Sequence, residues 1–192
     1  MAKQPLSPPL RYADSYPEVV TRLQVLPRTG WVQWQIENPE TVWEHILATR
    51  ELAVTLRDTL QLREEEFADL LAMIEIHDWP EALVGDDVIL GDEPDVATLR
   101  QQKQKRELAA MQEICSDKAA GAEIFRLYKR YAHGSDRVAQ LVKQLEKLQA
   151  VLKAIEYGKT HSKAGLAAEF IHYTRELIHE PALKARFEQL AA

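Results

Sequence analysis

Apolar residues recur at helical spacing along most of this chain, and this pattern limits the possible folds more than any other feature. In the segment 136–157, an apolar residue returns every three or four positions, at Val138, Leu141, Leu145 and Leu148. Such a stripe lies on one face of an α-helix. Similar patterns predict helices over about 39–56, 64–79, 96–115, 119–133, 163–179 and 181–191. The sequence therefore predicts an all-α, single-domain bundle of about six or seven helices.

The other segments are expected to connect or flank these helices. Residues 1–22 are predicted to be an amino-terminal lead-in, 23–160 the core, and 161–192 helices packed on the core. The stretch "WVQWQI" (31–36) alternates apolar and polar residues, but without a partner strand we expect an ordered extended segment. Asn38 and Pro39 are expected to begin the next helix as its N-cap and first-turn proline. Residues 86–95 are acidic, contain Gly91 and Pro94, and are predicted to be a loop.

Composition excludes several classes of function. The net charge is −6, and no basic stripe is present, so we do not expect a groove for a long nucleic acid. No apolar run has the length of a membrane span. The single cysteine, Cys115, cannot form an internal disulfide, and the first ten residues lack the apolar segment of a secretory signal. We therefore expect a cytoplasmic protein.

Three residues of the kind that bind metals lie on or beside inward helix faces. His45 shares a helix face with Val42 and Leu52, while His77 and Asp78 directly follow an apolar stripe that ends at Ile74. A buried charge without a partner is costly, and a metal ion would provide the partner. Imidazole nitrogen and carboxylate oxygen suit divalent zinc, manganese, cobalt, nickel or iron. The alternative is that the histidines are hydrogen-bonded core residues, which are more common than ligands.

Three segments of the chain together resemble a known family. They are "PRTGWVQWQIENPETVWEH" (27–45), "IEIHDWPEALVGD" (74–86) and "LVKQLEKLQAVLKAIEY" (141–157). In this order they resemble the HD-domain metal-dependent phosphohydrolases, and most closely the 5′-deoxynucleotidase branch, over about residues 23–157. The resemblance implies an HD-type helical bundle, a homodimer, and one divalent transition metal (cobalt, manganese, zinc, nickel or iron).

The resemblance also implies roles for individual residues. His45, His77 and Asp78 would be metal ligands, and Glu146 stands where the family has a fourth, aspartate ligand. The family segment resembles "LDKLE", whereas this chain reads "LEKLQ", with Gln149 in place of glutamate. The reach of the Glu146 side chain is longer by one C–C bond of about 1.5 Å. We expect it to ligate through a more distant helix or a folded side chain, or else more weakly.

The remaining roles concern the substrate. By resemblance, Glu81 would orient or activate the attacking water or deliver a proton, and Asp86 would position water or substrate. Arg28 would hold the phosphate, and Trp31 would line the sugar side. The implied activity is removal of phosphate from (deoxy)nucleoside 5′-monophosphates, which are small-molecule substrates. The alternatives are an HD-type phosphodiesterase, a nucleoside di- or triphosphate hydrolase, and a nucleotide-binding protein with an impaired metal site.

Overall fold

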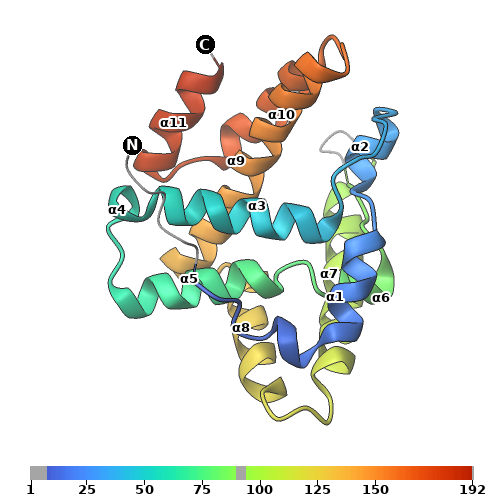
Figure 1. The fold of residues 1–192 in the computed structure, drawn as a ribbon, viewed down its shortest axis with the longest axis vertical. Coiled ribbons are helices and arrows are strands. Elements are labelled where there is room, and N and C mark those ends of the chain that lie inside the picture. The colour runs from blue at the N-terminus through green and yellow to red at the C-terminus, as the bar shows by residue number, and fades with distance from the viewer. Residues whose placement is uncertain (1–7, 90–93, 192) are drawn as a thin grey trace.

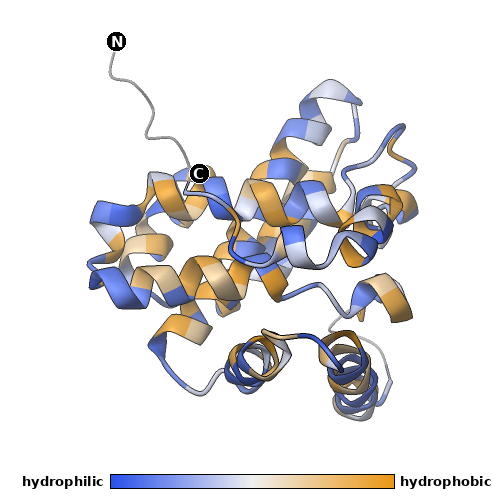
Figure 2. Cartoon of the chain, turned by 60° about the horizontal axis from the view of Figure 1, so that its bottom comes forward, coloured by the Kyte–Doolittle hydropathy of each residue, from blue (hydrophilic) through white to orange (hydrophobic). Residues whose placement is uncertain are grey.

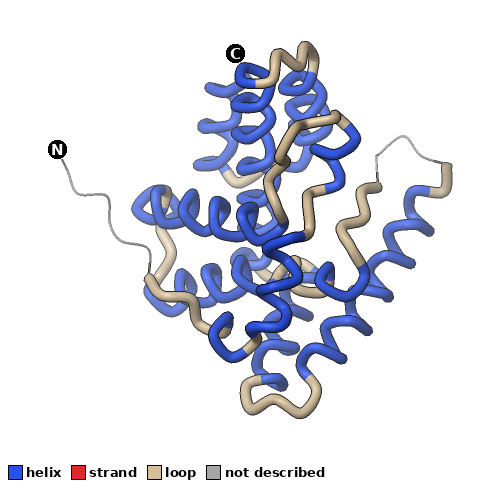
Figure 3. Tube along the Cα trace, turned by 45° about the vertical axis from the view of Figure 1, so that its right-hand side comes forward, coloured by secondary structure: helices blue, strands red, loops and turns tan. Residues whose placement is uncertain are grey.

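The computed structural model describes residues 8–89 and 94–191, and this part of the chain is entirely helical apart from loops and turns (Figure 3). Its only β-type pairing is an isolated bridge between Pro27 and Thr41. The all-α prediction is confirmed. The helices are α1 (Pro17–Val25), α2 (Thr29–Gln33), α3 (Val42–Thr55), α4 (Arg57–Leu60), α5 (Glu64–Ile76), α6 (Glu81–Val84), α7 (Val96–Cys115), α8 (Gly121–His133), α9 (Arg137–Thr160), α10 (Leu166–Thr174) and α11 (Pro181–Ala191), with short 3-10 helices η1 (Ala13–Ser15) and η2 (Arg175–Leu177).

The described residues form eleven α-helices, which exceeds the predicted six or seven. Three of them, α2, α4 and α6, have only four or five residues. Helices this short carry too little periodicity to be seen in a sequence. None of the described helices is both long enough and apolar enough to cross a bilayer.

Helices α3, α5 and α9 pack against one another and form the centre of the fold (Figure 1). Helix α8 covers α5 and α9, α7 packs on α8, and α10 and α11 lie against α9. Orange apolar stretches alternate with blue polar ones along the helices, as amphipathic packing requires (Figure 2). The apolar core includes Leu70, Ile74, Leu141, Leu145 and Leu148, all completely buried. The stripes read from the sequence are therefore the surfaces that join these helices.

Two local predictions near the amino end are wrong. The helix expected from Asn38 begins at Val42, because Thr41 accepts a hydrogen bond from Glu44 N (3.2 Å) while Glu44 accepts one from Thr41 N (2.8 Å). This capping box fixes the helix start. "WVQWQI" is not extended, since its first three residues belong to α2. The backbone N–H of Thr29, at the start of α2, is held by the Asp86 carboxylate at 2.7 Å.

Other boundaries agree with the sequence. Helix α5 begins at Glu64 and α7 spans Val96–Cys115, as predicted. Of the predicted loop 86–95, residues 86–89 contain no helix, and 90–93 lie outside the described residues. Residues 1–7 of the predicted lead-in also lie outside them, whereas Pro17–Val25 form α1. The division into lead-in, core and carboxy-terminal helices stays a prediction.

Candidate metal centre

His77 lies directly after α5, where the buried face of that helix ends. Its side chain is completely buried, and its Nδ1 lies 2.7 Å from the carbonyl oxygen of Ile74. A carbonyl oxygen only accepts hydrogen bonds, so Nδ1 carries the proton of the neutral ring. The Nε2 atom then presents a lone pair, and it has no hydrogen-bond partner. His77 is therefore prepared to accept a cation at Nε2.

His45 on α3 presents the same atom. Its side chain is 1% exposed, and its Nδ1 lies 2.5 Å from Oε1 of Gln149 on α9. Burial and the nearby Arg28 lower the pKa of His45 well below its ordinary value, so the ring is neutral. Its Nε2 is also buried without a hydrogen-bond partner. A second imidazole lone pair thus points into the same interior space.

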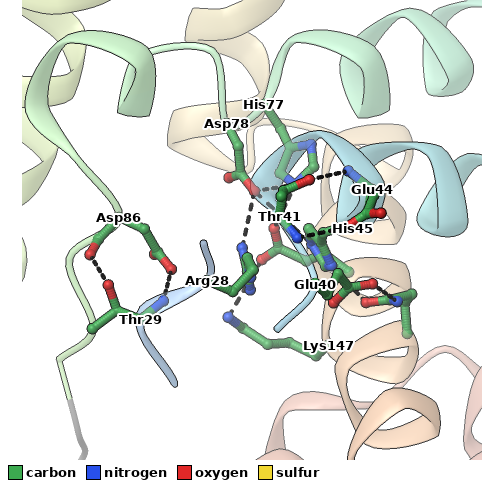
Figure 4. Close-up of polar contacts among 12 residues, drawn as sticks. Arg28, Thr29, Glu40, Thr41, Glu44, His45, His77, Asp78, Asp86 and Lys147 are labelled. Atoms are coloured by element: carbon green, nitrogen blue, oxygen red, sulfur yellow. Dashed lines mark hydrogen bonds and ion pairs between the residues drawn. The ribbon is translucent and has the colours of Figure 1, made fainter. Parts of the chain in front are cut away.

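Asp78 brings a carboxylate to both imidazoles (Figure 4). Its Oδ2 lies 3.1 Å from His77 Nε2 and 3.9 Å from His45 Nε2. Ligand atoms of the three residues all lie within 4.8 Å of one another. Burial raises the pKa of Asp78, but the neighbouring His77 and Arg28 groups outweigh burial and hold that pKa below its usual range. Burial also lowers the pKa of His77, whereas Asp78 and Glu146 outweigh it and raise that pKa. The negative field at Nε2 thus favours a cation.

Glu146 on α9 approaches from the side of His77. Its Oε2 lies 3.4 Å from His77 Nε2 and accepts a hydrogen bond from the Tyr131 hydroxyl at 3.1 Å. The Glu146 side chain is only 12% exposed, so it faces the interior rather than solvent. The group whose ligand atoms all lie within 4.8 Å of one another comprises His45, His77 and Asp78, and Glu146 adjoins this group at His77. This donor set, with two unpartnered imidazole nitrogens, fits a divalent transition metal.

Arg28 places a positive charge next to the carboxylate of this cluster. Its Nη1 donates to Asp78 Oδ2 at 3.1 Å, and the side chain is 20% exposed. Asp86 holds the segment that carries Arg28, since its Oδ2 accepts from Thr29 N (2.7 Å) and its carbonyl accepts from the Thr29 hydroxyl (2.6 Å) (Figure 4). The structure thus places Asp86 against the Arg28 segment.

Glu81 begins α6, one turn after Asp78. The residue is 5% exposed, and its Oε2 has no hydrogen-bond partner. Burial and the negative charges of Asp78 and Asp86 raise the pKa of Glu81 well above its ordinary value. The raised pKa favours the protonated carboxyl group, which is able to give up a proton.

With this geometry established, comparison with known proteins identifies the family. A model of the HD domain matches residues 20–185. The chain belongs to the HD domain family. A relative from Danio rerio, 5′-deoxynucleotidase HDDC2, is 31% identical over 90% of this chain and 83% of its own length. The protein of the same name from Dictyostelium discoideum is 30% identical over 90% of this chain and 93% of its own length.

A solved structure confirms the likeness of the fold. A crystallised protein from Pyrococcus horikoshii OT3 aligns with a TM-score of 0.71 and 25% identity, covering 92% of this chain and 97% of its own. The match to the HD domain, residues 20–185, includes α10 and the start of α11, beyond the span over which the sequence resemblance was drawn.

Trp31 is the one expected substrate contact that lies in the core of this HD domain. It is 1% exposed, its ring stacks on Phe170 with centroids 4.6 Å apart, and the edge of Tyr157 covers another side. Its Nε1 donates to Glu40 Oε2 at 3.1 Å. In this arrangement Trp31 offers no open face to a sugar, and it connects instead to a buried carboxylate.

Sequence reasoning missed the polar residues behind the ligands. Glu40, 5% exposed, and Gln149, 3% exposed, are bonded to each other at 2.8 Å although 109 residues separate them. The sequence carried one signal, since Gln149 lies four residues after the inward Leu145 and helical spacing therefore places it on or beside the buried face. Its partner could not be read from periodicity, because periodicity does not pair distant segments.

Proposed function

We propose that this HD domain is a metal-dependent phosphomonoesterase that removes the phosphate from deoxynucleoside 5′-monophosphates. One observation carries the proposal: two buried imidazole Nε2 atoms without hydrogen-bond partners lie beside the Asp78 carboxylate, with Glu146 next to His77 and Arg28 bonded to Asp78. Buried polar groups are usually hydrogen-bonded, and a bound cation would account for two imidazole nitrogens that lack such a bond beside a carboxylate. We assign metal ligation to His45, His77, Asp78 and Glu146.

The residues around the cluster suit phosphate transfer to water. His45, His77, Asp78 and Glu146 would hold a divalent ion, which would supply Lewis acidity toward a water molecule and a phosphoryl group. Arg28 offsets the charge of the phosphate, which the net charge of −6 would otherwise repel. Glu81, whose raised pKa favours the protonated form, gives its proton to the leaving nucleoside oxygen and takes up the proton that the attacking water releases. Asp86 supports the reaction by holding the Arg28 segment through Thr29.

The names of the relatives support the choice of substrate. Relatives from Danio rerio and Dictyostelium discoideum bear the name 5′-deoxynucleotidase, and both align over nine-tenths of this chain. The identity of the metal, the homodimer and the cytoplasmic location stay predictions.

Phosphate release from a panel of nucleotides tests the proposal. Ribo- and deoxyribonucleoside 5′-monophosphates, a phosphodiester and a nucleoside triphosphate are each supplied with Mn²⁺, Co²⁺, Zn²⁺, Ni²⁺ or Fe²⁺. We expect the deoxynucleoside monophosphates to be hydrolysed fastest and Asp78→Ala to abolish hydrolysis. Asp58→Ala, which changes an exposed aspartate on α4, is the matched control. Cleavage of only the diester or triphosphate would establish the alternative activity, and nucleotide binding without any hydrolysis would establish the impaired site.

Arg28 separates phosphate recognition from metal binding. Arg28→Ala should lower kcat/KM about 10- to 150-fold, which corresponds to one charged hydrogen bond of about 1.5–3 kcal/mol. It should leave the metal content unchanged, because Arg28 is not a ligand. Arg186→Ala, an exposed arginine on α11, is the control. Equal kcat/KM for Arg28→Ala and the control would exclude the assigned role.

A further inference from the structure

A line of buried hydrogen bonds leads from Trp31 to the metal centre. Trp31 Nε1 donates to Glu40 Oε2 at 3.1 Å, and Gln149 Nε2 donates to Glu40 Oε1 at 2.8 Å. The other end of the same amide, Gln149 Oε1, lies 2.5 Å from His45 Nδ1. Each of these four residues is at most 5% exposed. Solvent water therefore cannot supply a replacement hydrogen bond if one of these side chains reverses its donor and acceptor ends.

The direction of each bond follows from the chemistry of the two ends. The indole nitrogen of Trp31 only donates, so the Glu40 oxygen that faces it accepts. Burial raises the pKa of Glu40, whereas the N–H groups of Trp31 and Gln149 on its two oxygens favour the carboxylate form, which only accepts. Glu40 therefore accepts from both neighbours, which turns the nitrogen of the Gln149 amide toward Glu40 and its oxygen toward His45. An oxygen at that position requires a proton on His45 Nδ1. The lone pair of His45 is then left on Nε2, the atom that faces His77 and Asp78.

We propose that Glu40, acting through Gln149, is the positioning residue that fixes His45 in the tautomer able to bind a metal. The His45 nitrogen that can bind a metal is thus determined by the Glu40 carboxylate, which would contact neither the metal ion nor His45. Trp31 takes part because its N–H occupies the second oxygen of Glu40. The inference rests on the metal centre of the proposed function, but it concerns a property that the metal-free protein already has.

Replacing Glu40 by glutamine should reverse the donor and acceptor roles in the hydrogen bonds between residue 40, Gln149 and His45. In Glu40→Gln, Trp31 still needs an acceptor, so the new amide turns its oxygen to Trp31 and its nitrogen to Gln149. Gln149 must then present its oxygen to residue 40 and its nitrogen to His45. His45 can only accept from that nitrogen, so its proton moves to Nε2 and the ligand lone pair is lost. This substitution removes no metal ligand and hardly changes the volume of the side chain at position 40.

The double variant Glu40→Gln/Gln149→Glu restores the original direction. The amide at 40 gives its nitrogen to the new carboxylate at 149, and that carboxylate accepts from His45 Nδ1–H. We therefore expect the double variant to recover the tautomer that Glu40→Gln loses. A residue with only a structural role would give no such reversal and rescue.

The tautomer is measured directly by nitrogen-15 NMR of the imidazoles in metal-free protein at pH 7.5. We expect protonated Nδ1 for His45 in the unmodified chain and in the double variant, and protonated Nε2 in Glu40→Gln. Mn²⁺ titration should show Kd raised about 10- to 100-fold in Glu40→Gln and nearly restored in the double variant. Glu37→Gln, an exposed glutamate three residues away, should change neither readout.

Two results would overturn the proposal. One is an Nε2–H tautomer of His45 in the unmodified chain, which needs no variant to fold. The other is an unchanged tautomer and Kd in Glu40→Gln. Because neither measurement involves turnover, failure of the nucleotide panel would not be mistaken for failure of this inference.

Discussion

Replacement of Glu75 by glutamine should destabilise the fold by releasing the amino-terminal segment from α5. Glu75 is 1% exposed and accepts three backbone hydrogen bonds, each 2.7 Å long. Oε2 receives Arg11 N, while Oε1 receives Tyr12 N and Ala13 N. These N–H groups lie at the start of η1, where no helical carbonyl is available to them. One carboxylate therefore anchors a segment more than 60 residues away in the sequence.

The size of the effect follows from the difference between an amide and a carboxylate. Glutamine has the same shape but only one acceptor oxygen, so at least one N–H faces the amide nitrogen and loses its partner. A hydrogen bond to a charged group contributes about 1.5–3 kcal/mol, and the bonds that remain become weaker neutral ones. We expect the free energy of unfolding to fall by about 2–4 kcal/mol. For a chain of this length, that lowers Tm by roughly 4–16 °C.

Thermal and urea unfolding of the Glu75→Gln variant provide the assay. Glu65→Gln, an exposed glutamate on the same helix, is the control and should leave Tm nearly unchanged. Limited proteolysis should show earlier cleavage within residues 8–16 in Glu75→Gln than in the control. A Tm equal to that of the control, with the same proteolytic pattern, would refute the view that this carboxylate holds the segment.

Two further outcomes test the remaining buried groups. Glu146→Ala should weaken Mn²⁺ binding and lower turnover together, whereas Glu146→Asp should retain both; normal metal binding in the alanine variant, measured by titration, would show that three protein ligands suffice. Burial raises the pKa of Cys115 to about 11, so at pH 8 only about one thiol in a thousand is ionised, roughly 240-fold less than for free cysteine with a pKa of about 8.5. Alkylation by iodoacetamide, followed by mass spectrometry, should be slower by about that factor and should accelerate up to pH 10; a rate equal to that of free cysteine would contradict this.

The long helices were predictable because apolar residues at helical spacing form the face of the helix that is buried in the core. Helix α7 has the predicted bounds, and the stripe of α9 is the surface that packs on α3 and α5. The inward placement of His45 and His77 followed from this spacing. The Thr41 capping box was missed because Asn38 and Pro39 also form a plausible helix start. Two local signals competed, and only the packed structure decides between them.

Helix α2 could not be predicted because its cause lies elsewhere in the chain. Five residues have little helical stability of their own. Thr29 is held through the carboxylate and the carbonyl of Asp86, 57 residues away, and Trp31 is fixed by its stack on Phe170. The alternating pattern of "WVQWQI" suggested an extended segment, since alternation is a local property and these contacts are not. Trp31, which was expected to line the sugar side, is buried in the core for the same reason.

The ligand types were visible in the sequence, whereas the atoms that would bind were not. A histidine can bind through either nitrogen, and the choice depends on what the other nitrogen touches. For His77 the partner is the carbonyl of Ile74, three residues earlier, so any helix would supply it. For His45 the partner is Gln149, whose orientation in turn depends on Glu40. Two histidines that look equivalent in the sequence therefore differ in how securely their tautomers are fixed. His77 keeps its tautomer as long as α5 is intact. His45 keeps its tautomer only as long as the distant Glu40 carboxylate remains charged and in place.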